Sequence, residues 1–302
     1  MKPTLVVLAA GMGSRYGGVK QIDPVGPSGE AIIDYSIYDA IQAGYTQVVF
    51  VIRREIEADV RDFFSGKFDD LLEVDYVYQE LSDVPSGFSA PAHRTKPWGT
   101  AHAVLAARDV VAAPFAVING DDFYGREALQ TMSSYLQNRE SDDTDYAMVG
   151  YRLDRTLSEN GTVSRGIVTH DADGWLESIT EHTKLQGQEN RVASYDDTGT
   201  IRAWFNGDEA TSMNLFGFTP AAMGQLSEEF RRFLQDFGEQ PKSEFYIPYA
   251  MNRLKERGAA RMQVLRSDAE WFGVTYRQDR PDVVARIQSL VDQGKYPASL
   301  WS

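Results

Sequence analysis

A glycine-rich turn placed directly after a short apolar strand constrains this chain more than any other feature. Residues 8–21 read LAAGMGSRYGGVKQ, and the apolar residues 5–8 before them have the composition of a buried strand. The turn contains four glycines, Gly11, Gly13, Gly17 and Gly18. They let the backbone turn tightly and approach a ligand closely. Arg15 and Lys20 add two positive charges, so the turn suits a polyphosphate.

The spacing of the turn excludes two common phosphate-binding motifs. A dinucleotide fingerprint needs G-x-G-x-x-G, and Tyr16 stands at the third glycine position. A Walker A loop needs lysine directly after its second glycine, where this chain has Val19 and places Lys20 one residue late. An ordinary strand-to-helix turn with surface charges is the plain alternative. The coincidence of strand, arginine and lysine favours a ligand site.

The first half of the chain alternates expected strands and helices. The strands are expected at Thr4–Ala10, Gln47–Ile52, Val74–Gln79 and Pro114–Asn119. The helices are expected at about Glu30–Ala43, Ile56–Gly66 and Thr100–Val110. This order predicts an α/β fold, a Rossmann-like three-layer α/β/α arrangement whose central sheet is mixed but mostly parallel.

The second half adds β-hairpins. Turns at 173–174 and 197–199 separate short strand-like runs, and further strands are expected at 146–153, 212–218, 261–265 and 271–274. Helices are expected at about 221–237, 244–257 and 282–293. Without a clear linker, we expect one domain over 1–302. Residues 1–125 would form its first half, 126–280 its second half, and 281–302 a C-terminal helix and tail.

Composition excludes several classes of partner and chemistry. The chain has 30 basic and 44 acidic residues and a net charge of −14, which argues against nucleic acid or an anionic membrane as the main partner. It has no cysteine, so disulfides, cysteine-bound zinc and a thiol nucleophile are excluded. No apolar run approaches the ~20 residues that span a bilayer. We expect a cytoplasmic protein, and a homo-oligomer is possible because the apolar stripe of 223–237 could be core or a dimer interface.

A second cluster of polar residues follows the fourth expected strand. Asn119-Gly120-Asp121-Asp122 comes directly after the apolar residues 115–118. Parallel sheets bind ligands at the carboxyl ends of their strands, where the glycine-rich turn also lies. Mg²⁺ prefers oxygen ligands, and Asp121 is well placed to supply one. Asp122 could support that ligand or cap a helix.

The glycine-rich turn resembles the signature of the nucleotidyltransferases that activate sugar phosphates: a strand, A-A-G-x-G-S/T-R, a short spacer, then lysine. The resemblance implies a sugar-phosphate nucleotidylyltransferase with the nucleotide-diphospho-sugar transferase fold. Such an enzyme moves an NMP from an NTP to a phosphorylated small-molecule acceptor, here most readily a sugar 1-phosphate. Mg²⁺ is its cofactor, and pyrophosphate is released.

The resemblance also implies that 1–125 is a nucleotide-binding half and 126–280 an acceptor-binding half, with roles for residues in each. The NTP would lie on the residues of the turn, which are Leu8, Ala9, Ala10, Gly11, Met12, Gly13 and Ser14. The catalytic residues would be Arg15, Lys20 and Asp121, with Asp121 as the metal ligand. Gly99 and Thr100 resemble the G-T-A-x-A turn that recognises the base, and Gln79 resembles the glutamine before it. A helix beginning near Thr100 would explain the same residues.

Three residues of the acceptor-binding half are implied in the same way. Glu181 resembles the glutamate of the family's E-K pair, and Lys184, two places later than expected, resembles its lysine, which contacts the acceptor phosphate. Asn214 resembles the asparagine that hydrogen-bonds the sugar. A polar strand edge would also explain Lys184, and a core amide bonded to backbone would explain Asn214.

One position departs from the family pattern. Many relatives carry W-x-D-x-G-T, in which the aspartate is a second metal ligand, whereas Gly273 stands at that position here. Either the metal keeps one protein carboxylate, or one of Asp268, Glu270 and Asp279 substitutes. Two other functions stay open: a cytidylyltransferase for a non-sugar phosphate or phosphonate, and a non-catalytic regulatory protein that binds a nucleotide sugar. An oxidoreductase is more distant.

Overall fold

The computed structural model describes residues 1–10, 22–158, 161–273 and 277–301. Its parallel strands are β1 (Thr4–Leu8), β2 (Gln47–Ile52), β3 (Glu73–Tyr78) and β4 (Phe115–Asn119). β1 lies between β2 and β4, and β3 continues the sheet beyond β2. All five residues of β1 are buried, as expected for a strand with helices on both faces.

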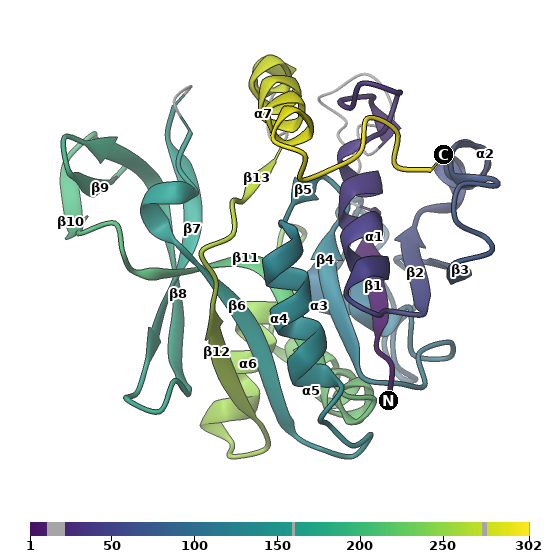
Figure 1. Cartoon of the computed structure of the whole chain (residues 1–302). Coiled ribbons are helices and arrows are strands. Elements are labelled where there is room, and N and C mark those ends of the chain that lie inside the picture. Colours follow the sequence, from purple (N-terminus) through teal and green to yellow (C-terminus); the bar gives the residue numbers. More distant parts are fainter. Residues whose placement is uncertain (11–21, 159–160, 274–276, 302) are drawn as a thin grey trace.

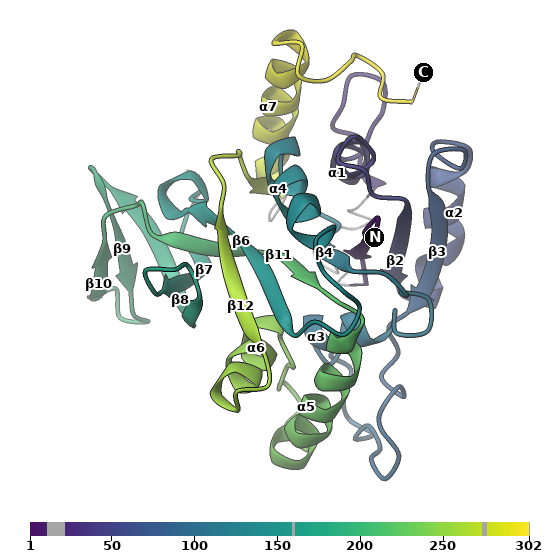
Figure 2. The ribbon, with the colours of Figure 1, turned by 60° about the horizontal axis from the view of Figure 1, so that its bottom comes forward.

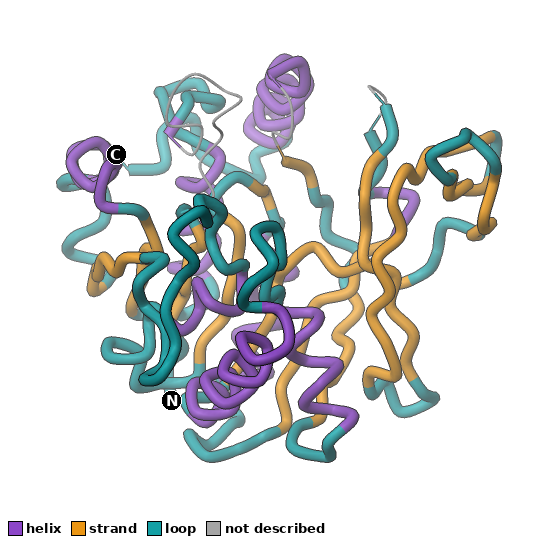
Figure 3. Tube along the Cα trace, turned by 180° about the vertical axis from the view of Figure 1, so that it is seen from behind, coloured by secondary structure: helices purple, strands orange, loops and turns teal. Residues whose placement is uncertain are grey.

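Antiparallel strands extend this sheet to eleven in the described residues. They are β6 (Asp145–Arg152), β7 (Val163–His170), β8 (Leu176–Gln188), β9 (Arg191–Tyr195), β10 (Ile201–Phe205) and β11 (Ala210–Phe218), with β12 (Arg261–Arg266) parallel to β6. The order is β10-β9-β8-β7-β11-β4-β1-β2-β3, and β6 joins β11 to β12. The ladder β7–β10 extends away from the helices (Figure 1; Figure 3).

Helices cover both faces of the sheet. One face carries α1 (Ile32–Gln42), α2 (Glu57–Phe64) and α4 (Arg126–Leu136), and the other carries α3 (Thr100–Leu105), α5 (Ala221–Phe237) and α6 (Ile247–Glu256). Figure 2 shows α4 and α5 on opposite sides of the sheet. The α7 helix (Arg280–Asp292) packs near a small ribbon of β5 (Asp122–Phe123) and β13 (Phe272–Gly273). Short 3-10 turns lie at Arg54–Ile56, Leu153–Arg155 and Arg277–Asp279.

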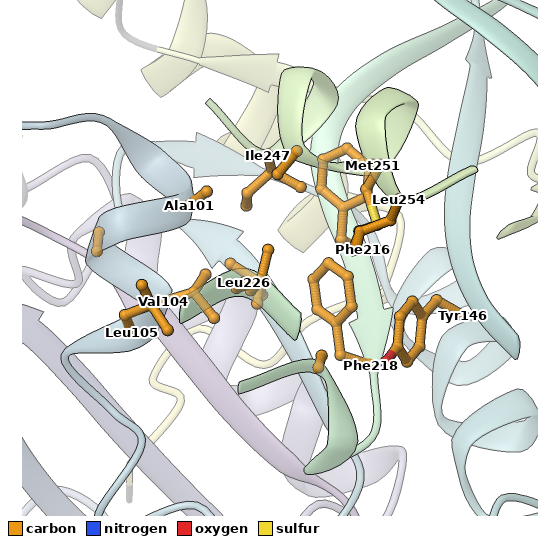
Figure 4. Close-up of a cluster of buried hydrophobic side chains, with 14 of the residues drawn as sticks. Ala101, Val104, Leu105, Tyr146, Phe216, Phe218, Leu226, Ile247, Met251 and Leu254 are labelled. Atoms are coloured by element: carbon orange, nitrogen blue, oxygen red, sulfur yellow. The ribbon is translucent and has the colours of Figure 1, made fainter. Parts of the chain in front are cut away.

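The core separates into two layers because side chains of a strand alternate between its faces. Val6 and Leu8 of β1 pack with α3, α5 and α6, whereas Leu5 and Val7 pack with α1 and α4. In the first layer, Leu226 of α5 lies near Phe216 and Phe218 of β11 (Figure 4). The apolar stripe of α5 is therefore mostly part of the interior.

The predicted three-layer α/β class with C-terminal hairpins is confirmed. β2 and α5 have the predicted bounds. The sequence analysis missed α4, although Ala128, Leu129, Met132 and Leu136 have helical spacing and are buried. It also predicted a helix over Thr100–Val110, whereas α3 ends at Leu105. In the described residues, no helix is long and apolar enough to cross a membrane.

We expect Leu226→Ala to lower the free energy of unfolding by about 2–5 kcal/mol, because it leaves a cavity between α5 and the sheet. Leu71→Ala is the matched control, since Leu71 is 57% exposed and its truncation should cost no more than about 0.5 kcal/mol. Chemical denaturation measures both values. Equal losses would contradict the placement of this core.

Candidate active site

A cavity of about 280 Å³ opens beyond the carboxyl end of β4, where the parallel strands meet the antiparallel ladder. It brings together Asp121, Glu181 and Asn214, which the sequence analysis had singled out separately. The other lining residues are Asn119, Asp122, Ser164, Arg165, Gly166, Ser212, Met213, Pro248 and Trp271. Most of these side chains carry polar atoms, so the cavity can exchange hydrogen bonds with a hydroxylated ligand.

The residues after β4 are tied to the end of β1. The backbone N–H of Gly120 donates to the carbonyl of Leu8 over 2.9 Å. A Cβ on Gly120 would lie 3.3 Å from that of Ala9, so glycine allows this close approach. Asp121 is therefore held beside the point where the glycine-rich turn begins.

Part of the predicted nucleotide site lies outside the described residues. These residues are Gly11, Met12, Gly13, Ser14, Arg15 and Lys20. Leu8, Ala9 and Ala10 are described and buried at the end of β1. The proposed roles of the turn therefore stay predictions.

The missing aspartate at position 273 has a structural counterpart in Asp122. Gly273 pairs with Asp122 across the β5–β13 ribbon, and a Cβ on Gly273 would overlap Oδ1 of Asp122. Asn119 Nδ2 donates to Oδ2 of Asp122 over 2.9 Å. The hydroxyl of Tyr124 lies 3.4 Å from the same oxygen. Because Gly273 has no side chain, the carboxylate of Asp122 on the neighbouring strand β5 occupies that space.

The substitutes considered from sequence lie elsewhere. Asp268 and Glu270 line a separate, larger cavity together with Arg155. Asp279 directly precedes α7. None of the three lines the cavity that contains Asp121.

Arg165 of β7 is a lining residue that the sequence analysis did not single out. Its Nε donates to the carbonyl of Thr156 over 3.0 Å, its Nη2 donates to the same oxygen, and its Nη1 donates to the carbonyl of Ser164 over 2.8 Å. The guanidinium carbon lies 4.9 Å from the ring centre of Trp271. Burial lowers the pKa of Arg165 to about 10, and the carboxylates of Asp122 and Glu181 oppose this effect.

Glu181 lies across the β7–β8 pair from Gly166. Burial raises the pKa of its carboxyl group, while Arg165 nearby acts in the opposite direction. The cavity therefore contains acidic and basic groups that influence one another, as binding sites often do.

Asn214 has an unusual backbone conformation. Its φ is +63°, a region that asparagine adopts more readily than most residues. It lies where the register of β11 against β6 shifts between Ser212 and Phe216. Such a bulge redirects side chains, and Asn214 lines the cavity.

Lys184 lies away from the cavity that Glu181 lines. It occupies an irregular point of the β7–β8 pair, with φ of +54°. Its Nζ lies 2.9 Å from a carboxylate oxygen of Asp197 and 3.5 Å from the carbonyl of Asp196, at the β9–β10 turn. The structure therefore does not bring Lys184 together with Glu181 and Asn214, and its role stays a prediction.

Gln79, Gly99 and Thr100 do come together, at the end of β3. The amide Nε2 of Gln79 donates to the carbonyl of Gly99 over 2.9 Å and lies 3.3 Å from Nδ1 of His102. Thr100 begins α3, but its hydroxyl accepts the N–H of Ile247 at the start of α6 rather than capping its own helix. This turn is therefore locked to a segment far away in sequence.

Most missed lining residues gave no sequence signal. Ser164 and Arg165 lie in a polar stretch of strand without a motif, whereas Ser212 begins the apolar run that contains Asn214. Only the pairing of β7 with β8 and β11 places them beside Asp121.

Comparison with known families matches residues 4–194 to the model described as nucleotidyl transferase. No curated protein shows significant similarity to this chain. A putative glucose-1-phosphate thymidylyltransferase from Bacillus anthracis is similar in structure, with TM-score 0.62, 14% identity, and coverage of 94% of this chain and 95% of that one.

Two further solved structures are similar over nearly their whole length. A UDP-glucose pyrophosphorylase complexed with UDP-glucose has TM-score 0.61, 15% identity, and coverage of 96% and 99%. The inositol-1-phosphate CTP transferase from T. maritima has TM-score 0.59, 13% identity, and coverage of 95% and 96%. At these identities, the likeness shows the fold.

Gly99→Ala tests how tightly the turn before α3 is built. Gly99 has φ of +114°, and an added Cβ would lie 2.6 Å from the backbone oxygen of Phe245. Gly87→Ala is the matched control, with φ of +92° and nothing within 4 Å. Both variants place alanine at a positive φ, which costs on the order of 1–3 kcal/mol. Gly99→Ala should lose a further ~1–3 kcal/mol of unfolding free energy from overpacking. Equal melting temperatures would contradict this close contact.

Proposed function

The chain belongs to the nucleotidyl transferase family of enzymes, and we propose that it transfers a nucleotidyl group from an NTP to a sugar 1-phosphate. The observation that supports this acceptor class is the polar cavity in which Asp121, Glu181 and Asn214 meet. Carboxylate and amide groups can bind several hydroxyls of one small molecule. We propose that residues 1–125 hold the nucleotide and that 126–280 build the acceptor pocket.

The reaction needs positioning and charge stabilisation rather than a covalent enzyme intermediate. An oxygen of the acceptor phosphate would attack the α-phosphorus of the NTP, and pyrophosphate would leave in line. The backbone of residues 8–14 would hold the triphosphate, and Gln79 with Gly99 and Thr100 would face the base. Arg15 and Lys20 would offset negative charge during the transfer.

The donor set fits Mg²⁺. Asp121 and Asp122 both line the cavity, and the space beside Gly273 is used by a carboxylate oxygen of Asp122. In the described residues, no three histidine or acidic side chains cluster as a closed metal site. Two carboxylates together with substrate phosphates suit this ion. Asp121 and Asp122 would hold it, and the ion would neutralise phosphate charge.

The test of the proposed function is pyrophosphate release over a panel of NTPs and acceptors. Glucose 1-phosphate represents the sugar phosphates, and inositol 1-phosphate represents other polyol phosphates. A phosphonate represents acceptors without a phosphate ester. We expect turnover with at least one NTP and a sugar 1-phosphate. Turnover with a phosphonate alone, or nucleotide binding without any turnover, would contradict the proposal.

Asp121→Asn should lower kcat on the order of 10²–10³-fold, because it removes a charged ligand from a charge-stabilising site. Asp142→Asn is the control, since Asp142 is exposed on the loop before β6. The measurement is steady-state turnover together with a Mg²⁺ titration. Wild-type turnover in Asp121→Asn would rule out Asp121 as a ligand of the metal.

Gly273→Ala should raise the Mg²⁺ concentration for half-maximal activity about 10- to 100-fold, because the new methyl group displaces Asp122. The control is Gly224→Ala, where nothing lies within 4 Å of the added Cβ. Mn²⁺ binding by electron paramagnetic resonance checks the metal site without turnover. Unchanged affinity in Gly273→Ala would rule out Asp122 as a ligand.

A further inference from the structure

Among the described residues that line the cavity, Arg165 is a cation and the other charged side chains are acidic. Its neighbours on the wall include Asp121, Asp122 and Glu181. In the described part of the chain, no carboxylate lies within 4.0 Å of its guanidinium nitrogens. Its hydrogen bonds go to the backbone carbonyls of Thr156 and Ser164 instead.

Among the described residues, the charge of Arg165 therefore has no direct counter-ion. Burial lowers its pKa to about 10, even with two acidic side chains acting against that change. Removing a cation from water is costly unless an anion accompanies it. An anionic ligand entering the cavity would supply that partner.

The hydrogen bonds of Arg165 also leave donors available. A guanidinium has five N–H groups, and three of them account for the bonds to Thr156 and Ser164. Counting contacts to described residues alone, one N–H remains on each terminal nitrogen. Two such donors match two oxygens of a phosphate. The same wall carries Trp271, whose buried Nε1 has no hydrogen-bond partner among the described residues.

Lys184 does not offer the same contact from its observed position. Its ammonium group pairs with Asp197 at the β9–β10 turn, outside the cavity. Arg165, by contrast, lines the cavity with Glu181. The positive charge beside Glu181 therefore comes from β7 rather than from β8.

We propose that Arg165 binds the phosphate of the acceptor, and that Glu181 and Asn214 bind its hydroxyls. This inference rests on the proposed function. The acceptor class that fits is a phosphomonoester of a small polyhydroxylated compound. The cavity of about 280 Å³ limits its size.

The experiment measures acceptor and NTP kinetics in Arg165→Gln and Arg165→Lys. With glucose 1-phosphate as the acceptor, we expect Arg165→Gln to raise the acceptor KM about 10- to 100-fold, the usual effect of losing charged hydrogen bonds. The KM for the NTP should stay unchanged. Arg165→Lys retains the charge but not the two-donor geometry, so its acceptor KM should rise less.

Arg202→Gln is the matched control. Arg202 of β10 pairs with Asp196 of the β9–β10 turn and is outside the cavity, so its loss should leave both KM values unchanged. Thermal melting reports whether each variant folds. If Arg165→Gln does not fold, the acceptor KM of Arg165→Lys decides whether Arg165 binds the acceptor phosphate.

Calorimetry separates this inference from the proposed function. Wild-type protein should bind glucose 1-phosphate and, more weakly, inorganic phosphate, and Arg165→Gln should lose both. This result would support Arg165 even if no acceptor is turned over, in which case only the proposed function fails. A wild-type acceptor KM in Arg165→Gln, no phosphate binding by the wild type, or a 10-fold KM increase in Lys184→Ala instead would overturn the assignment.

Discussion

The parallel pairing of β1 with β4 is the interaction on which the candidate site depends. It matches Leu8 with Asn119, and the Gly120 N–H continues the pairing by donating to Leu8. The glycine-rich turn and Asp121 therefore begin at the same edge of the sheet. Both strands are buried between two helical layers, and a shift of either strand would separate the two segments.

The second wall of the cavity comes from strands that run in the opposite direction. β11 lies beside both β4 and β7, so it connects Asp121 on one side with Arg165 and Glu181 on the other. Its irregular register near Asn214 adds an amide to the same wall. Among the described lining residues, the cavity thus combines the carboxylates of Asp121, Asp122 and Glu181 with the guanidinium of Arg165. This charge arrangement suits a metal ion and a phosphate together.

Local pattern predicted much of the fold, and its failures have physical causes. β2 was predicted with its bounds because it is a short continuous apolar run, and α5 because its apolar residues have helical spacing up to Gly238. α4 was missed although its apolar spacing is helical, because no capping side chain marks its start at Gly125. The lysine expected beside Glu181 points to Asp197 instead, because the β7–β8 pair is irregular at that point. A local sequence pattern cannot predict such a change in the direction of a side chain.

The sequence by itself determined the α/β class, the glycine-rich turn after the first strand, and the family, because these depend on residues close together along the chain. The tertiary structure alone decided that Arg165 lies with Glu181 and Asn214, and that Asp122 fills the space left by Gly273. Those neighbours are 16 to 151 positions apart in the printed sequence. Strand pairing and register bring them together, and both depend on how the whole sheet packs against its helices.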